Sequence, residues 1–253
     1  MRKNNLFYIL IISTFFAVLL FNPNLRPNVW DSYEYLNLGK SLAQGKGNLQ
    51  IWNPEEPSGW RSVGYPYLLS VLMRISDNIT YLKCFSLVCY IANILLIYYL
   101  FLKIFRLPDI IILIFSLIIN LNLITITLSH SIMSDTPFLT MLILSLISIT
   151  KYIEHNKNIN IYILLVPLFM VCSWQIRSLG LTVILAIFIY LFVEKYFKKF
   201  VYLTLFTTPI LLVVYFNNNT GTGIIDNYNF LSTLMNTIYH PQAFTQLIFD
   251  GFS

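Results

Sequence analysis

The sequence predicts an all-α, polytopic membrane protein with about seven transmembrane helices. Of its 253 residues, 57% are hydrophobic and only 11% are charged, and its mean hydropathy is +0.69. A soluble domain carries about 25% charged residues, and a disordered chain combines high charge with low hydrophobicity. Apolar runs of helical length recur along the whole chain, and the basic residues between them alternate in a way that fits the two sides of a membrane.

The first apolar run predicts an uncleaved signal anchor. Leu6–Phe21 follows Arg2 and Lys3, but no small-residue cleavage site comes after it. Six further runs are each expected to form one transmembrane helix of about 20 residues or fewer; they lie at 82–102, 107–128, 136–150, 159–176, 178–193 and 200–216. The runs between 136 and 193 are short for spans, so flanking residues must complete them or the bilayer must thin locally.

Two polar stretches are expected on one side of the membrane. Residues 22–78 form the predicted first outer loop, with an amphipathic juxtamembrane helix near 31–42 and a short apolar segment at 65–75. Residues 217–253 form the predicted outer C-terminal segment, which opens with an Asn- and Gly-rich loop signal. Without any internal repeat, residues 1–253 are expected to form a single transmembrane domain.

The positive-inside rule gives the orientation. With a cytoplasmic N-terminus and seven alternating spans, the inner connections hold nine basic and three acidic residues, a net charge of +6. The outer side then has a net charge of −1, and the charges of the two sides add up to the net charge of +5 for the whole chain. The basic character of the chain is therefore a topology signal, and no nucleic-acid partner is expected. The three cysteines lie in apolar runs and are expected to be buried free thiols.

Asp31 and Glu34 are the first unusual polar residues on the predicted outer side. Asp31 shares a helical stripe with Tyr35, four residues later. The pair can be explained as a helix N-cap with a capping-box partner or as part of an active site at the membrane surface. The two roles are compatible, and both stay open.

The segment from Trp60 to Pro66 returns the chain to the membrane. Pro66 is expected to keep Tyr65 out of the helical region, and Gly64 permits a tight turn. Arg61 is a candidate phosphate-binding cation. Tyr65 is explained equally well as an interfacial aromatic residue or as a substrate contact.

Asp135 and His130 flank the start of the predicted span at 136–150. Pro137 suits the first turn of a helix, with Thr136 as its cap. Asp135 would stabilise that helix N-terminus or face the same aqueous cavity as Asp31. His130 is a third polar candidate, and with Asp31 and Asp135 it completes the set of candidate metal ligands.

Arg177 separates the runs 159–176 and 178–193. An arginine at mid-membrane would cost roughly 2.5–3.5 kcal/mol, so it is expected at the outer end of a helical hairpin. There it would either snorkel to the interface or clamp a phosphate or carboxylate.

Taken in order, these four segments resemble the GT-C superfamily of polytopic glycosyltransferases. The closest type is the group of dolichyl-phosphate-mannose protein mannosyltransferases and lipid A aminoarabinose transferases. The D-x-x-x-Y-x-x-x-A/G-like helix corresponds to Asp31, Tyr35 and Gly39, and the R-P-P-G-Y-P-like segment to 61–66 with both leading prolines replaced. The S-D that opens a later span is 134–135, and the R-P-x-G-L-like segment is 177–181, again without its proline. The resemblance covers about 30–195.

This resemblance implies transfer of a sugar from a polyprenyl-phosphate-linked donor to an outer-facing lipid, protein or polysaccharide acceptor. It implies Asp31 as the catalytic base, and Glu34, Tyr35, Arg61, Tyr65, Asp135 and Arg177 as substrate-binding residues. A divalent metal is left open, because some relatives use one and others do not. The expected location is the cell membrane of a bacterium or archaeon, with the active site on the outer face.

Two alternatives remain at this stage. A transporter or flippase for a lipid-linked or anionic substrate would need polar residues through the depth of the bilayer, for which Asn93, Asn120 and Asn122 are candidates. A truncated chain or an inactive subunit of a glycosyltransferase assembly is suggested by length, because members of the resembled family usually have more spans.

Overall fold

The computed structural model describes residues 2–19, 30–46, 62–155 and 160–219. In these ranges the chain forms helices and no strand, which confirms the predicted all-α class. The helices are α1 (Arg2–Leu19), α2 (Trp30–Ala43), α3 (Gly64–Met73), α4 (Ile79–Tyr99), the π-helix η1 (Leu100–Ile104), α5 (Asp109–Asn120), α6 (Leu123–Ser129), α7 (Asp135–Glu154), α8 (Tyr162–Ile176), α9 (Gly180–Val193) and α10 (Phe197–Asn219).

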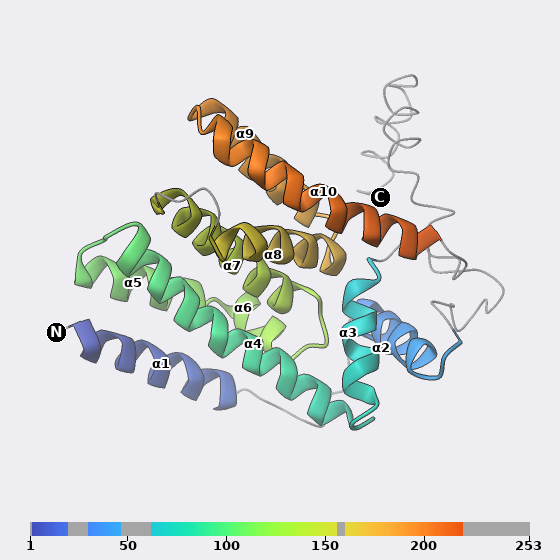
Figure 1. Ribbon diagram of the computed structural model, residues 1–253. Coiled ribbons are helices and arrows are strands. Elements are labelled where there is room, and N and C mark those ends of the chain that lie inside the picture. Colours follow the sequence, from blue (N-terminus) through green and yellow to red (C-terminus); the bar gives the residue numbers. More distant parts are fainter. Residues whose placement is uncertain (1, 20–29, 47–61, 156–159, 220–253) are drawn as a thin grey trace, which may run out of the picture.

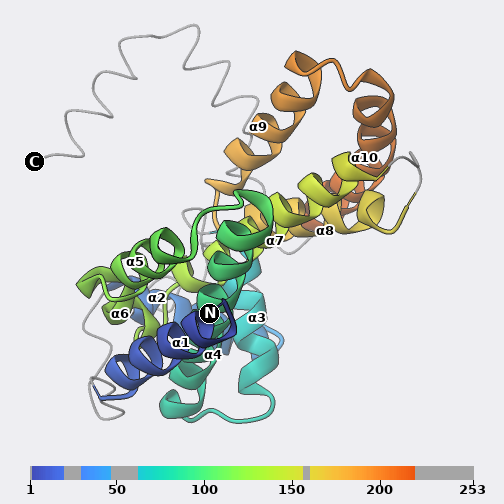
Figure 2. The same ribbon diagram turned by 90° about the vertical axis from the view of Figure 1, so that its left-hand side faces the viewer.

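The long helices form a bundle, and α2 and α3 lie together at one end of it (Figure 1). Seen along the bundle in Figure 2, α1, α4 and α5 lie on one side and α9 and α10 on the other. Two apolar cores match this division. One joins α1, α4 and α5 around Ile9 and Tyr90, and the other joins α7 to α10 around Tyr152 and Met170.

Two helical segments among the described residues are long and apolar enough to cross a membrane. They are Ile79–Ile104, which comprises α4 and η1 and has 26 residues, and α7 with 20 residues. The other apolar helices are shorter: α9 has 14 residues, which is about 21 Å at 1.5 Å per residue. The hydrocarbon core of a bilayer is about 30 Å thick, so the short helices predicted between 136 and 193 do occur for α8 and α9.

Apolar side chains cover much of the described surface. Helix α9 contains no charged residue, yet it exposes Leu185, Ile189 and Phe192. A helix that is hydrophobic on every face is found inside a large protein or in contact with lipid. The surface of α9 is therefore suited to lipid contact. All three cysteines are free, as predicted, but only Cys89 is buried; the prediction of burial is wrong for Cys84, which is exposed on α4, and for Cys172, which is partly exposed.

Two predicted elements differ from the structure in detail. The run 107–128 forms α5 and α6, because the Asn122 side chain accepts a hydrogen bond from the backbone N–H of Ile124 at 2.9 Å and starts a new helix. The prediction that Tyr65 stays outside the helical region is wrong, since α3 begins at Gly64. Pro66 then lies in the first helical turn, where its missing N–H costs no hydrogen bond.

The end of the bundle opposite α2 and α3 is rich in basic residues. Lys199, near the start of α10, donates hydrogen bonds to the backbone oxygens of Tyr152, Ile153 and His155 at 2.9, 2.6 and 2.9 Å. A cation at the C-terminus of α7 also interacts favourably with the helix dipole. These hydrogen bonds hold the start of α10 against the end of α7. Both of these helix ends carry basic residues that the sequence assigns to the inner side.

Candidate functional site

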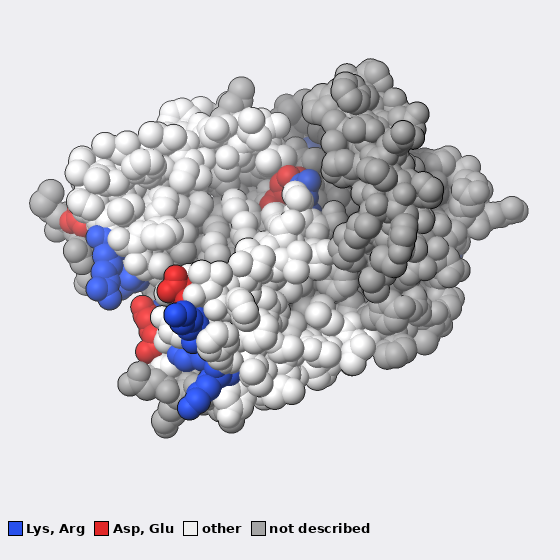
Figure 3. Space-filling model, turned by 90° about the horizontal axis from the view of Figure 1, so that it is seen from above, with Lys and Arg blue, Asp and Glu red and all other residues white. Residues whose placement is uncertain are grey.

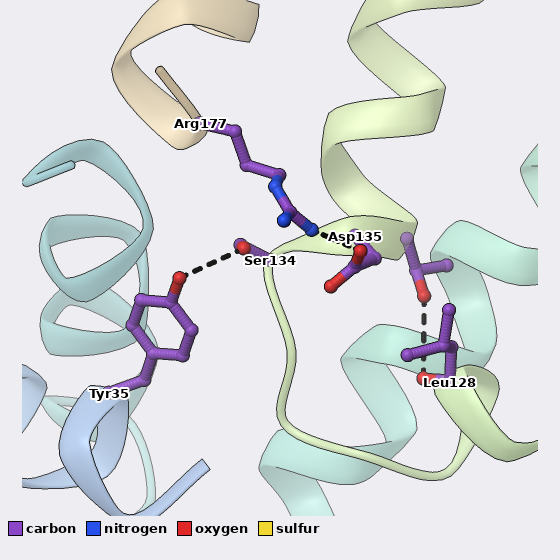
Figure 4. Close-up of polar contacts among 6 residues, drawn as sticks. Tyr35, Leu128, Ser134, Asp135 and Arg177 are labelled. Carbon is purple, nitrogen blue, oxygen red and sulfur yellow. Dashed lines mark hydrogen bonds and ion pairs between the residues drawn. The ribbon is translucent and has the colours of Figure 1, made fainter. Parts of the chain in front are cut away.

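The start of α7 is the point at which the predicted outer segments meet. Ser134, the residue before α7, shares a hydrogen bond with the Tyr35 hydroxyl of α2, with 3.0 Å between the two oxygens (Figure 4). Both residues are buried, so the contact is shielded from water. It joins the first of the four sequence segments to the third, which are 99 residues apart.

Tyr65 joins α3 to the same place. Its ring meets the Tyr35 ring edge to face, with 4.9 Å between the centroids and 89° between the planes. Tyr65 is fully buried, and burial raises the pKa of its hydroxyl. The two tyrosines lie in one apolar cluster with Ile132 and Ile176, so Tyr65 packs helices together rather than facing an open surface.

Two glycines allow these segments to approach closely. A Cβ atom at Gly64 would lie 2.5 Å from the backbone oxygen of Gln175, next to the end of α8. A Cβ atom at Gly39 would lie 3.0 Å from the Cβ of Leu69 and 3.4 Å from the backbone oxygen of Pro66. Contact of α3 with α2 and α8 therefore depends on residues without side chains, which explains both glycines of the sequence motifs.

Asp135 and Arg177 form an ion pair between α7 and α8. Arg177 Nη1 donates to Asp135 Oδ1, and the two side chains approach each other from different elements in Figure 4. Their side chains are 31% and 32% exposed, so the pair is within reach of water or a ligand. A guanidinium has five N–H donors in a planar fork, and donors not directed at Asp135 are able to bind an anion.

The local backbone holds Arg177 in position. Arg177 is the C-cap of α8, with an extended backbone, and its N–H bonds the backbone oxygen of Ser173 at 3.0 Å. Gly180 begins α9 directly afterwards, and a Cβ there would lie only 2.2 Å from the backbone nitrogen of Trp174. The turn between α8 and α9 therefore requires glycine at 180 and directs residue 177 toward α7.

The first turn of α7 is also fixed from α4 and α6. The Asn93 side-chain amide donates to the backbone oxygen of Thr136 at 3.0 Å. The Thr136 hydroxyl donates to the backbone oxygen of Leu128 at 3.3 Å. Thr136 lies inside α7, which begins at Asp135, so the prediction that Thr136 caps this helix is wrong. The reason is that the Thr136 hydroxyl bonds to a neighbouring helix.

Asp31 and Glu34 lie in the first turn and a half of α2. Asp31 is half-buried and Glu34 is buried. Asp31 precedes Tyr35 by four residues, so it lies one turn away on the same face of α2. Since α2 begins at Trp30, Asp31 is within the helix and is not its N-cap. Its charge still favours the N-terminal end of the helix. Arg61 lies outside the described residues.

His130 lies at the end of α6, close to a lysine that sequence reasoning passed over. Burial, together with the charge of Lys83, lowers the pKa of His130. Lys83 is only 3% exposed and is the single charged residue in the run 79–102. An ionisable residue inside an apolar run marks a functional candidate by default, and that signal was present in the sequence.

The metal candidates do not form a ligand set in the described structure. Asp31, Asp135 and His130 were the proposed ligands, but the residues that the structure describes contain no group of three or more His, Cys, Asp or Glu side chains placed to hold a metal ion. Asp135 is instead paired with Arg177. No step of the chemistry considered below passes through a metal.

The polar residues that suggested a transporter have structural partners. Asn93 bonds Thr136, and the Asn120 amide donates to the backbone oxygen of Ser116 at 2.7 Å. The Asn120 backbone oxygen accepts from the Tyr90 hydroxyl at 2.8 Å. Asn122 starts α6. The Asn93 amide thus links α4 to α7, the Asn120 amide bonds within α5, and the Asn122 side chain caps α6, so each of these contacts has a structural role.

Comparison of the chain with models of known protein families, with curated proteins and with solved structures gives no match.

Proposed function

We propose that the chain is a multi-pass membrane protein with seven spans and a cytoplasmic N-terminus. The spans would be α1, α4 with η1, α5 with α6, α7, α8, α9 and α10. The length of α4–η1 and α7, together with the exposed apolar side chains of α9, supports this placement. So does the gathering of basic residues at one end, next to Lys199. In this placement α2 and α3 lie at the outer surface.

We further propose that the protein is a glycosyltransferase that uses a polyprenyl-phosphate-linked sugar. One observation carries the proposal: the four segments that resemble glycosyltransferase motifs meet at the start of α7. Tyr35 contacts Ser134 and Tyr65, Gly64 lies against Gln175, and Asp135 pairs with Arg177.

In the proposed reaction, an acceptor hydroxyl attacks the anomeric carbon of the sugar. The Asp31 carboxylate takes the hydroxyl proton, because a neutral hydroxyl is a weak nucleophile. The new bond joins the acceptor oxygen to the anomeric carbon as the bond from that carbon to the phosphate oxygen breaks. The transition state is oxocarbenium-like, and polyprenyl phosphate leaves with the bonding electrons and one added negative charge.

Arg177 is the proposed partner of the leaving phosphate. It lies at the outer end of α8, at headgroup depth in the proposed placement, and it is partly exposed. Hydrogen bonds to a charged phosphate are about twice as strong as neutral ones, and they strengthen as charge develops on the leaving oxygen. Asp135 would act as a positioning residue, because its carboxylate holds one edge of the guanidinium.

The test is transfer of labelled sugar in membranes that contain the full chain. The probes are polyprenyl-phosphate mannose and polyprenyl-phosphate aminoarabinose, with label followed from the donor lipid into any acceptor. Asp31→Asn should abolish transfer, and Arg177→Lys should reduce it at least tenfold because lysine lacks the planar fork. Asp77→Asn is the matched control, since Asp77 is an exposed acid of the α3–α4 loop on the same side.

Full transfer by the Asp31→Asn variant would reject the proposed base. If Asp31→Asn and Asp77→Asn both lost transfer, the loss would reflect the total negative charge on the outer side and not a specific role of Asp31 as base. Hydrolysis of the donor lipid without any labelled acceptor product would be consistent with a donor-binding site. It would reject sugar transfer to an acceptor as the reaction.

A further inference from the structure

We propose that the protein binds an anionic phospholipid of the inner leaflet in a cavity between η1, α7 and α9. The inference rests on the membrane placement proposed above and not on sugar transfer. It concerns the end of the bundle opposite α2 and α3, which the proposed reaction does not use.

The cavity for the lipid tail is apolar and has a volume of about 510 Å³. Leu100 and Ile104 of η1, Leu146 and Ile149 of α7, and Ala186 and Ile187 of α9 lie on its walls. It follows α7 from Leu142 to Glu154, a distance of about 18 Å at 1.5 Å per residue. One leaflet of the hydrocarbon core is about 15 Å deep, so the cavity matches the depth of a lipid tail.

A polar pocket of about 540 Å³ adjoins this cavity at the end of α7. Lys103, Arg106 and Lys151 contribute basic side chains, and Glu154 lines both spaces. Lys151 bonds Glu154 at 2.6 Å, which balances one charge. The charge of Arg106 also acts on the Glu154 carboxylate. Three basic side chains against one acid leave the pocket a net charge of +2, the equivalent of two cations, for a phosphate.

Charged side chains gather at this end of the molecule in Figure 3, and a smaller charged group lies apart from them in a recess. An apolar slot that leads to a basic pocket is complementary to a molecule with an apolar tail and an anionic head. A neutral lipid would leave the two cations unused, and a free phosphate would leave the slot unfilled. An anionic phospholipid satisfies both parts, and basic residues near a membrane surface attract such lipids.

The backbone of η1 connects the two spaces, and Arg106 comes just after it. The π-helix η1 contributes Leu100 and Ile104 to the apolar cavity and Leu102 and Lys103 to the polar pocket. Single π-turns are rare and are found frequently at functional sites. Arg106 follows with φ = 52°, a left-handed conformation that favours glycine and costs an ordinary residue free energy. The Leu107 N–H bonds the backbone oxygen of Phe101 at 3.1 Å, so the positive φ of Arg106 closes the end of the helix, as that of Lys195 does after α9.

This strain supplies a matched pair of variants. Arg106→Gly removes the cation and suits the left-handed backbone, so the fold should be retained. Lys195→Gly is the control, because Lys195 also has a positive φ, 59°, and lies at the same end of the bundle after α9, but does not line either space. Both variants lose one positive charge and gain one glycine.

The experiment measures bound lipid by native mass spectrometry of the purified full chain in detergent. The probes are dioleoyl phosphatidylglycerol, dioleoyl phosphatidylcholine and glycerol 1-phosphate. We expect phosphatidylglycerol to bind at least tenfold more tightly than phosphatidylcholine, and Arg106→Gly to weaken it about fivefold. Lys195→Gly should bind as the unaltered chain does, and glycerol 1-phosphate should not compete.

A second pair tests the tail cavity. Ala186→Phe places a ring in the apolar cavity, whereas Leu185→Phe places the same ring at the adjacent exposed position of α9, which does not line the cavity. Only Ala186→Phe should reduce lipid binding. The proposal is overturned by equal binding of the two lipids, by equal effects within either pair of variants, by competition from glycerol 1-phosphate, or by a lipid-free dimer that covers the cavity.

Discussion

Arg177 and Asp135 pair at the ends of two antiparallel helices, and each charge also suits its own helix. Asp135 is the first residue of α7, where a negative charge is favourable, and Arg177 caps the C-terminus of α8, where a positive charge is favourable. The pair therefore combines an ion pair with two favourable helix-dipole interactions. This accounts for its place at the junction of the outer segments, and it leaves part of the guanidinium available for a ligand.

The first prediction concerns the strength of this pair. A double-mutant cycle with Asp135→Asn and Arg177→Gln should give a coupling free energy of about 1 kcal/mol, because the pair joins two helices whose ends are held in place by other contacts. Denaturant unfolding in detergent micelles is the measurement. The control cycle uses Lys151→Gln and Glu154→Gln, a pair of similar exposure but three residues apart within α7, which should couple by about 0.3 kcal/mol. Equal couplings would show that the junction gives the Asp135–Arg177 pair no special strength.

The second prediction concerns the hydroxyl of Tyr35. Tyr35→Phe should destabilise the protein by about 1 kcal/mol, because it leaves the buried Ser134 hydroxyl without this partner. Tyr33→Phe is the control on the same helix, since Tyr33 is 44% exposed, and it should change the unfolding free energy by less than about 0.5 kcal/mol. The measurement is the unfolding midpoint of each variant in the same detergent. Similar midpoints would show that the Tyr35–Ser134 hydrogen bond does not stabilise the position of α2.

Local features of the chain were predictable from the sequence. The helix near 31–42 is present as α2 because its apolar residues recur at helical spacing. Pro137 lies in the first turn of α7 because proline is tolerated there without loss of a hydrogen bond. The positive-inside rule predicted that the segments holding Tyr35, Ser134, Asp135 and Arg177 share one side of a membrane, and the structure brings these four residues together.

Contacts between helices were not predictable in the same way. Arg177 was expected either to snorkel to the interface or to clamp a phosphate or carboxylate. Its pairing with the Asp135 carboxylate depends on how the α8–α9 turn orients residue 177. The burial of Lys83 depends on helices distant in sequence. Tyr65 is helical because packing against Tyr35 outweighs the local preference of a residue that precedes proline.

The third prediction concerns the close approach of α3 to α8. Gly64→Ala should destabilise the protein by about 1–3 kcal/mol, because the new Cβ would lie 2.5 Å from the backbone oxygen of Gln175. Gly39→Ala should cost less. Its Cβ would lie 3.0 Å from the Leu69 Cβ, a looser contact, and the higher helix propensity of alanine, by about 1 kcal/mol, offsets part of the loss.

Thermal unfolding and the yield of folded protein in detergent compare the two alanine variants. A larger loss for Gly39→Ala than for Gly64→Ala would mean that α2, rather than the end of α8, limits how closely α3 can pack.

The fourth prediction concerns acid sensitivity. Burial and the positive charge of Lys83 hold the pKa of His130 below its usual value of about 6.5 in the folded state. As the pH falls below about 6.5, the unfolded chain therefore binds a proton that the folded chain does not. Folding stability is lost in that window, by up to about 1.4 kcal/mol per pH unit, and it is fully present above it.

His130→Gln should remove this part of the pH dependence, so the variant should lose less stability between pH 7.5 and pH 5 than the unaltered chain. His155→Gln is the control, because His155 is exposed at the opposite end of α7. Unfolding free energies at both pH values separate the two cases. If both histidine variants kept the full acid sensitivity, the proton would be taken up elsewhere. Because Lys83 acts through its charge, Lys83→Met should raise the pKa of His130 and reduce the acid sensitivity in the same direction.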